Sequence, residues 1–357
     1  MAQVTIGQIL EFFLQRSRDE IRILEAILAD EVGREDLQRM ITHSSRTPQE
    51  RLARALLKKA QWAVFSQFEY DTPCTEMFAE AAAAYELLGE RNMANKLTFR
   101  SGNKDIVYLE RIRALCQKND LTTARELLAR MPQNDLHPLG WIAIADKSRE
   151  EDDYARVKAT TLGIRIALAE SRAKEDGGQM LMAMRNEAEL HMNQTYDGTY
   201  WYVLASLAKE YARQRLFAQS RTIIQQLDSG VHTNSHHRLD AAHTLARASK
   251  DPRDIAAYKE MGERRYDSDR VSYAICLSHI AAITGDEKDF AACQEVLEEK
   301  TQLSHQKCFA YHALAIAYAE CGQIQAARDI TDKIVVPYVE SKTLARIARI
   351  ILSQDPT

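Results

Sequence analysis

The sequence predicts an all-α protein, an α-solenoid of antiparallel helix hairpins. Three observations point to this fold. The 357-residue chain has only 13 glycines and 7 prolines, so it is short of the turn residues that β-rich folds need. Apolar residues recur at helical spacing along nearly the whole chain, without a run of alternating β-branched residues. Short polar breaks separate these segments into lengths of roughly 12 to 20 residues, typical of globular helices.

The N-terminal region begins with two amphipathic stretches. Ile, Leu and Phe fall on one helical face in residues 6–14, and the same face continues through residues 21–28. Two breaks follow, SSRTP at 44–48 and DTP at 71–73. Because nothing before residue 70 matches the repeat units further along, we expect residues 1–70 to form an N-terminal helical cap. Residues 71–357 are expected to form the repeat array.

The middle and C-terminal regions show a regular spacing. The breaks EDGG at 175–178 and YDG at 196–198 enclose a segment that we expect to be an inserted helix, near 176–193. A period of about 35 residues is typical of a solenoid, in which each hairpin buries its apolar face against its neighbours. From residue 199 onward, the predicted hairpins with this spacing begin near Thr199, His236, Arg270 and His305.

Three segments carry the same pattern of small and aromatic residues around a turn. Each has a small residue on its first helix, an aromatic residue three positions later, a turn residue, and a small residue on its second helix. The small residues let the two helices approach closely, and the aromatic ring fills the gap between successive hairpins. The positions are Ala82, Tyr85, Gly89 and Ala94 in the first segment, Ala208, Tyr211, Arg215 and Ser220 in the second, and Ala315, Tyr318, Gly322 and Ala327 in the third.

These segments resemble the tetratricopeptide repeat, although Arg215 replaces the turn glycine and residues 137–170 and 236–265 lack the signature. The resemblance implies a right-handed superhelix that serves as a scaffold, adaptor or chaperone-like module. Such a module holds a peptide or helix of another protein in a concave groove. The first helix of each repeat would line that groove. Counting from Leu207, Leu277 and Leu314, the candidate partner-binding residues are Tyr202, Lys209, Arg213, His279, Phe309, His312 and Glu320.

A metal site is one alternative, in the stretch VHTNSHHRLDAAH. In a helix that starts near Ser235, the residues His236, Asp240 and His243 have i, i+4, i+7 spacing and share a face. Two imidazoles and a carboxylate can bind zinc or iron, which would make this a metal- or small-ligand-binding regulatory or enzymatic protein. The other interpretation is that His236 and His237 lie in a solvated loop at a helix start.

RNA binding is a second alternative. The stretch ARELLARMPQND at 124–135 is similar to the end of a pentatricopeptide repeat, an RNA-binding module, but it covers one repeat only. Charge argues against it, because the chain has a formal net charge of −4. Residues 1–100 carry 13 basic and 15 acidic side chains, residues 101–200 carry 14 and 16, and the rest carry 20 of each. We therefore expect neither nucleic acid nor a membrane surface as a partner.

The sequence carries none of the common motifs for catalysis or for secretion. The chain has no GxGxxG, GxxxxGK[ST] or GxSxG, so we expect no enzymatic activity and no cofactor. The N-terminus lacks a basic signal-peptide region, and no run of about 18 apolar residues occurs. The six cysteines form no CxxC and are expected to be free thiols in a reducing compartment, the cytoplasm. The oligomeric state is not indicated.

Overall fold

The computed structural model describes residues 47–65, 75–159, 161–192, 199–228, 235–264, 269–298 and 304–353. These residues form 18 α-helices and no strand, which confirms the all-α prediction. No helix in the described ranges has the length and apolar character needed to cross a membrane. Most of the expected N-terminal cap, residues 1–70, lies outside the described residues.

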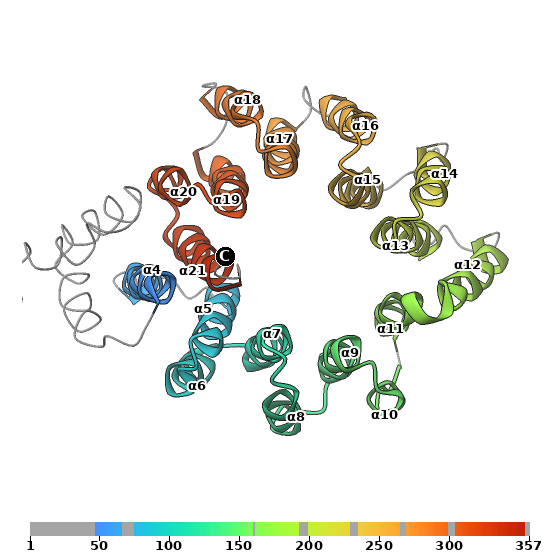
Figure 1. Ribbon diagram of the computed structural model, residues 1–357, viewed down its shortest axis with the longest axis horizontal. Coiled ribbons are helices and arrows are strands. Elements are labelled where there is room, and N and C mark those ends of the chain that lie inside the picture. The colour runs from blue at the N-terminus through green and yellow to red at the C-terminus, as the bar shows by residue number, and fades with distance from the viewer. Residues whose placement is uncertain are drawn as a thin grey trace, which may run out of the picture. The chain divides into compact units, whose positions relative to one another are not determined.

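The chain divides into two compact units. Unit 1 combines residues 1–132 with residues 297–357, and unit 2 is residues 133–296. The helices of unit 1 are α4 (Pro48–Phe65), α5 (Thr75–Leu87), α6 (Arg91–Arg100), α7 (Lys104–Gln117), α8 (Leu121–Ala129), α19 (Ser304–Glu320), α20 (Ile324–Thr331) and α21 (Pro337–Ser353) (Figure 1). Those of unit 2 are α9 (His137–Ser148), α10 (Glu151–Ala155), α11 (Leu162–Asp176), α12 (Gln179–Met192), α13 (Thr199–Arg213), α14 (Phe217–Asp228), α15 (Ser235–Ser249), α16 (Pro252–Glu263), α17 (Arg270–Thr284) and α18 (Glu287–Glu298).

The predicted spacing of the hairpins is confirmed. The first helices of four successive hairpins begin at Thr199, Ser235, Arg270 and Ser304, each within one residue of its predicted start. Segment 176–193, expected as an inserted helix, holds α12, which contacts both α11 and α13. It therefore lies where the second helix of a hairpin lies.

Four hairpins close through the same turn. In the α13–α14 turn the Leu216 N–H donates to the Tyr211 carbonyl at 2.8 Å, and the Arg215 N–H donates to the Ala212 carbonyl at 3.0 Å. This pair of bonds is the Schellman arrangement, which needs a left-handed residue at the turn. Arg215 fills that position with φ of 64°. The same bonds and a positive φ recur at Gly89, Asn119 and Gly322.

Small residues bring the paired helices together, as the pattern predicts. Ser220 of α14 is fully buried, and its hydroxyl donates to the Ala208 carbonyl of α13 at 2.8 Å. Ala94 and Ala327 hold the equivalent positions and are also fully buried. A larger side chain at these positions would force the two helices apart, which is costly in a close-packed interior.

The helices of unit 2 form two rows (Figure 1). The A row consists of α9, α11, α13, α15 and α17, and each contacts the next member of the row. The B row consists of α10, α12, α14, α16 and α18, the second helices of the hairpins. This arrangement buries one side of each A-row helix under its own hairpin partner and leaves another side away from the B row.

In unit 1 the last helix packs against the first described ones. Helix α21 contacts α4, α5 and α19, although α4 and α5 are far away in the sequence. Most residues of helix α5 are buried, and the four alanines at residues 81–84 are completely buried. Alanine is the side chain that allows this many neighbours to approach one helix at no rotamer cost.

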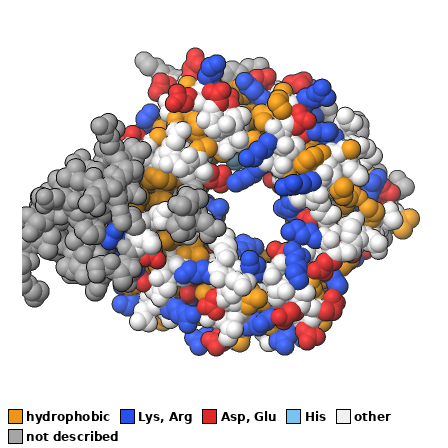
Figure 2. Space-filling view, viewed as in Figure 1, with side chains coloured by type: hydrophobic (Ala, Val, Ile, Leu, Met, Phe, Trp, Pro, Cys, Tyr) orange, Lys and Arg blue, Asp and Glu red, His pale blue; other side chains and the backbone are white. Residues whose placement is uncertain are grey.

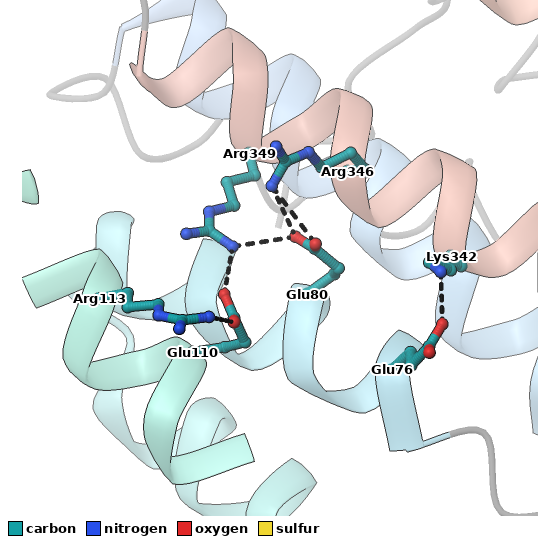
Figure 3. A network of polar contacts seen from close by, with 7 residues as sticks. All are labelled: Glu76, Glu80, Glu110, Arg113, Lys342, Arg346 and Arg349. Atoms are coloured by element: carbon teal, nitrogen blue, oxygen red, sulfur yellow. Dashed lines mark hydrogen bonds and ion pairs between the residues drawn. The ribbon is translucent and has the colours of Figure 1, made fainter. Parts of the chain in front are cut away.

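Charged side chains join α21 to α5 and α7 (Figure 3). Arg349 of α21 is nearly buried and donates to Glu80 at 3.1 Å and to Glu110 at 2.9 Å. Arg346 bonds the same Glu80, and Lys342 pairs with Glu76. Burial by itself would raise the pKa of Glu110, but Arg113 and Arg349 outweigh it and hold this pKa below its usual range. The Glu110 carboxylate therefore stays ionised, and ion pairs hold the junction together.

Candidate partner-binding face

Helix α13 presents three of the predicted partner-binding residues on one side. Tyr202, Lys209 and Arg213 follow the i, i+7, i+11 spacing that brings side chains to one helical face. The opposite side is packed into unit 2, with Leu204 and Leu207 buried. Tyr202 is 36% exposed, and Arg213 is exposed, so both can reach a partner.

Helix α15 lies beside α13 and continues the same surface. The rings of Tyr202 and His237 are 5.2 Å apart. Lys209 donates through Nζ to the Asp240 carboxylate at 3.0 Å, and the Lys209 side chain is only 16% exposed. The Asp240 side chain is 57% exposed, so its second oxygen remains accessible to solvent. The ion pair fixes the lysine head in place next to an open carboxylate.

Helix α17 adds an imidazole to this surface. His279 stacks on His243 of α15, with ring centroids 4.1 Å apart and the planes tilted by 13°. The Nδ1 atom of His279 lies 3.0 Å from the hydroxyl of Tyr258 in α16, and Tyr258 is buried. Tyr258 also stacks on His243, with 5.5 Å between centroids. One B-row tyrosine therefore supports two A-row histidines.

Burial sets the protonation of this cluster. The pKa of His243 falls to about 4 because burial disfavours the imidazolium, and Arg247 adds to this effect more than Asp240 opposes it. Burial likewise raises the pKa of Tyr258, so its hydroxyl keeps its proton. At neutral pH His243 is therefore uncharged, and it contributes hydrogen-bonding and stacking capacity to the surface.

We call this surface the A-row face. Its side chains come from three neighbouring A-row helices, α13, α15 and α17. Some of these side chains contact one another between helices, and the others lie at helical spacing from them on the same helix. Its residues are Tyr202, Lys209, Arg213, His237, Asp240, His243, Arg247 and His279. Figure 2 shows Lys and Arg side chains gathered over this part of α13 and α15.

The remaining predicted partner-binding residues belong to unit 1. Phe309 of α19 is 44% exposed. His312 is half-buried against α21, where its Nδ1 atom lies 2.9 Å from the Thr343 hydroxyl. Glu320 is partly exposed at the C-terminal end of α19. Exposure therefore separates Phe309, which a partner could contact, from His312, whose ring packs between two helices.

The proposed metal ligands are placed as follows. The His236 side chain lies outside the described residues, and the described chain contains no group of three or more His, Cys, Asp or Glu side chains arranged to hold a metal ion. Asp240 pairs with Lys209, and His243 stacks on His279. Both side chains thus have protein partners from neighbouring helices.

Sequence reasoning missed His237 and Arg247 as parts of the surface. The segment 236–265 lacks the repeat signature, so no register was assigned to α15. The period itself was a usable signal, because one repeat of about 35 residues from Tyr202 leads to His237. The same step links His243 with His279, which are stacked.

Comparison with known proteins gives no family assignment. No protein-family model matches the chain, and no curated protein sequence matches it significantly.

Proposed function

We propose that this protein is a tetratricopeptide-like interaction scaffold, a right-handed solenoid that holds a peptide or helix of a partner protein on the A-row face. It works in the cytoplasm as a non-enzymatic binding module, of the adaptor or chaperone kind. The observation that carries this proposal is the composition of the face. Long polar and aromatic side chains from three neighbouring helices contact one another, as in the Lys209–Asp240 pair and the His243–His279 stack.

Such a surface suits a peptide for two physical reasons. Tyr and Arg are the residue types enriched at protein interfaces, because they combine apolar area with directional hydrogen bonds. The second reason is pre-organisation. Lys209 is already held by Asp240, so its side chain loses less conformational entropy when a partner binds than a free lysine would.

The size of the face sets the length of the ligand. Packed helices lie about 8–10 Å apart, so three neighbouring helices span roughly 20 Å. An extended peptide rises about 3.3 Å per residue, so about six residues would cross the face. A helical ligand, which rises about 1.5 Å per residue, would instead cross it with about 13 residues, or nearly four turns.

A random-peptide phage library displayed against the full chain tests this function. Peptides enriched on the native protein should lose binding several-fold to a variant with Lys209→Glu and Arg213→Glu. They should bind normally to a variant with Arg253→Glu and Lys288→Glu, exposed positions on the B-row helices α16 and α18. Thermal denaturation of all three proteins must agree closely. Enriched peptides that bind the first variant as well as the native chain would place the binding surface elsewhere, and a library without any enriched peptide would refute the function.

A further inference from the structure

Charge in unit 2 is divided between the two rows of helices. The A row carries nine basic and six acidic side chains, a net charge of +3. The B row carries five basic and thirteen acidic side chains, a net charge of −8. Since the two helices of one hairpin lie in different rows, the net charge of the helices changes sign from one row to the other.

The difference is sharpest around the A-row face. Helices α13, α15 and α17 have five basic side chains against two acidic ones, while α14, α16 and α18 have four basic against eight acidic. Both acidic side chains of the first group are already paired. Asp240 accepts from Lys209 at 3.0 Å, and the buried Glu210 accepts from Arg213 at 3.3 Å. The excess positive charge of the three helices therefore comes from Arg238, Arg247 and Arg270, of which Arg247 is exposed; Arg213 is exposed as well.

We propose that the A-row face selects an acidic segment of the partner protein. The carboxylates of that segment would approach Arg213 and Arg247, which can each bind a carboxylate through two parallel hydrogen bonds. An apolar or aromatic residue of the segment would lie against Tyr202 and His237, whose rings are 5.2 Å apart. This inference rests on the proposed function and adds the chemistry of the ligand to it.

A protein segment fits the face better than a nucleic acid does. The half-exposed carboxylate of Asp240 lies among the cations of the face. A phosphate backbone carries a negative charge at every step, so one of its phosphates would meet Asp240. A peptide can place an uncharged residue or a backbone N–H at that point instead. The stacked imidazole of His243, with its pKa near 4, adds no charge at neutral pH that would attract phosphate.

Fluorescence anisotropy with labelled 12-residue probes tests the inference on the full chain. The probes are an acidic peptide of Glu, Ser and Tyr, the same peptide with Gln for Glu, the same peptide with Lys for Glu, and a dT12 oligonucleotide. We expect the acidic peptide to bind at least tenfold more tightly than the Gln and Lys versions. We also expect its affinity to fall about tenfold between 50 and 500 mM salt, because most of the attraction is between exposed charges.

Two charge-reversal variants with equal changes in net charge locate the binding. Arg213→Glu with Arg247→Glu alters the A-row face, and Arg253→Glu with Lys288→Glu alters the B row at two exposed positions. The first should weaken the acidic peptide at least tenfold, and the second less than twofold. Equal effects of the two variants would overturn the inference, because they would indicate attraction by net charge alone.

The remaining outcomes separate the inference from the proposed function. If the Gln or Lys peptide binds as well as the acidic one and the A-row variant weakens it, the face binds peptides without acidic selectivity, and only the inference fails. If dT12 binds more tightly than the acidic peptide, the face recognises phosphate, and the inference is wrong. If no probe binds and the phage library shows no enrichment, the proposed function fails as well.

Discussion

Protonation of His312 should make the stability of unit 1 depend on pH. The Thr343 hydroxyl has one proton and donates it to the Val339 carbonyl at 2.6 Å, so it must accept from His312 Nδ1–H. Burial, and then the charges of Lys342 and Arg346, disfavour a second proton on the ring despite the opposing charge of Glu76, and they lower the pKa of His312 to about 4. An unfolded histidine has a pKa of about 6.5.

The sign and size of the effect follow from these two pKa values. Between pH 6.5 and pH 4 the unfolded chain binds more protons than the folded one, so the free energy of unfolding falls as the pH falls. The loss is absent above pH 7 and reaches roughly 2 kcal/mol at pH 5. Below about pH 4 both states are protonated, and the histidine causes no further change.

Urea denaturation followed by circular dichroism at pH 7.5 and at pH 5.0 measures this loss. The control variant is His312→Asn, because the amide nitrogen of Asn can take the place of Nδ1 in the bond to Thr343 but does not titrate. The native chain should lose about 2 kcal/mol more than the variant between the two pH values. Contributions from Glu110 and other carboxylates cancel in this comparison. An equal loss in both proteins would show that His312 does not hold a lowered pKa, and the reasoning from burial would be wrong.

Three further predictions concern turns, close packing and thiols. Arg215→Gly and Lys250→Gly should each raise the free energy of unfolding by about 0.5–1 kcal/mol in urea titrations, because these exposed residues hold φ of 64° and 53°. A loss of stability would show that their side chains matter more than their backbone strain. Gly262→Ala should lower the free energy of unfolding by roughly 1–3 kcal/mol, because a Cβ there would lie 2.6 Å from Cys276 Sγ. An unchanged urea midpoint would mean that α16 and α17 can move apart without cost. Burial raises the pKa of Cys293 to about 12, so iodoacetamide at pH 8 should modify it only in urea, and mass spectrometry of native samples would reveal any modification.

The repeated hairpins could be predicted because their signals are local. Helical periodicity, the small residue at the helix contact and the aromatic three positions later all act within one hairpin of the array. Tyr85, Tyr211 and Tyr318 are buried where the pattern puts them. The residue at the turn was less predictable, because the turn needs a residue with left-handed backbone angles but this residue does not have to be glycine. Asn119 and Arg215 accept this conformation at a cost of about 1 kcal/mol, which the hairpin contacts outweigh.

No comparable pattern in the local sequence indicates the contacts between segments that are far apart in the chain. Glu80 and Arg346 are 266 residues apart, and nothing in either local sequence links α5 to α21. The histidines of α15 illustrate the same limit at shorter range. Spacing on a single helix grouped His243 with Asp240 as candidate metal ligands. The contacts made by those side chains run instead to His279 and to Lys209 on the neighbouring helices.

The even charge along the chain and the divided charge of unit 2 have one explanation. A window of 100 residues contains nearly three hairpins, so it averages helices of the A row with helices of the B row. From α15 to α18 the net charge of successive helices is +1, −1, +1 and −3, and only a count made helix by helix can detect this change of sign. Electrostatic attraction acts over about 10 Å at physiological salt, which is the distance between neighbouring helices and not the length of a sequence window. Within unit 2, a partner approaching α13, α15 and α17 therefore meets helices of net positive charge on a protein whose net charge is −4, which favours the approach of an acidic segment on that side of the unit.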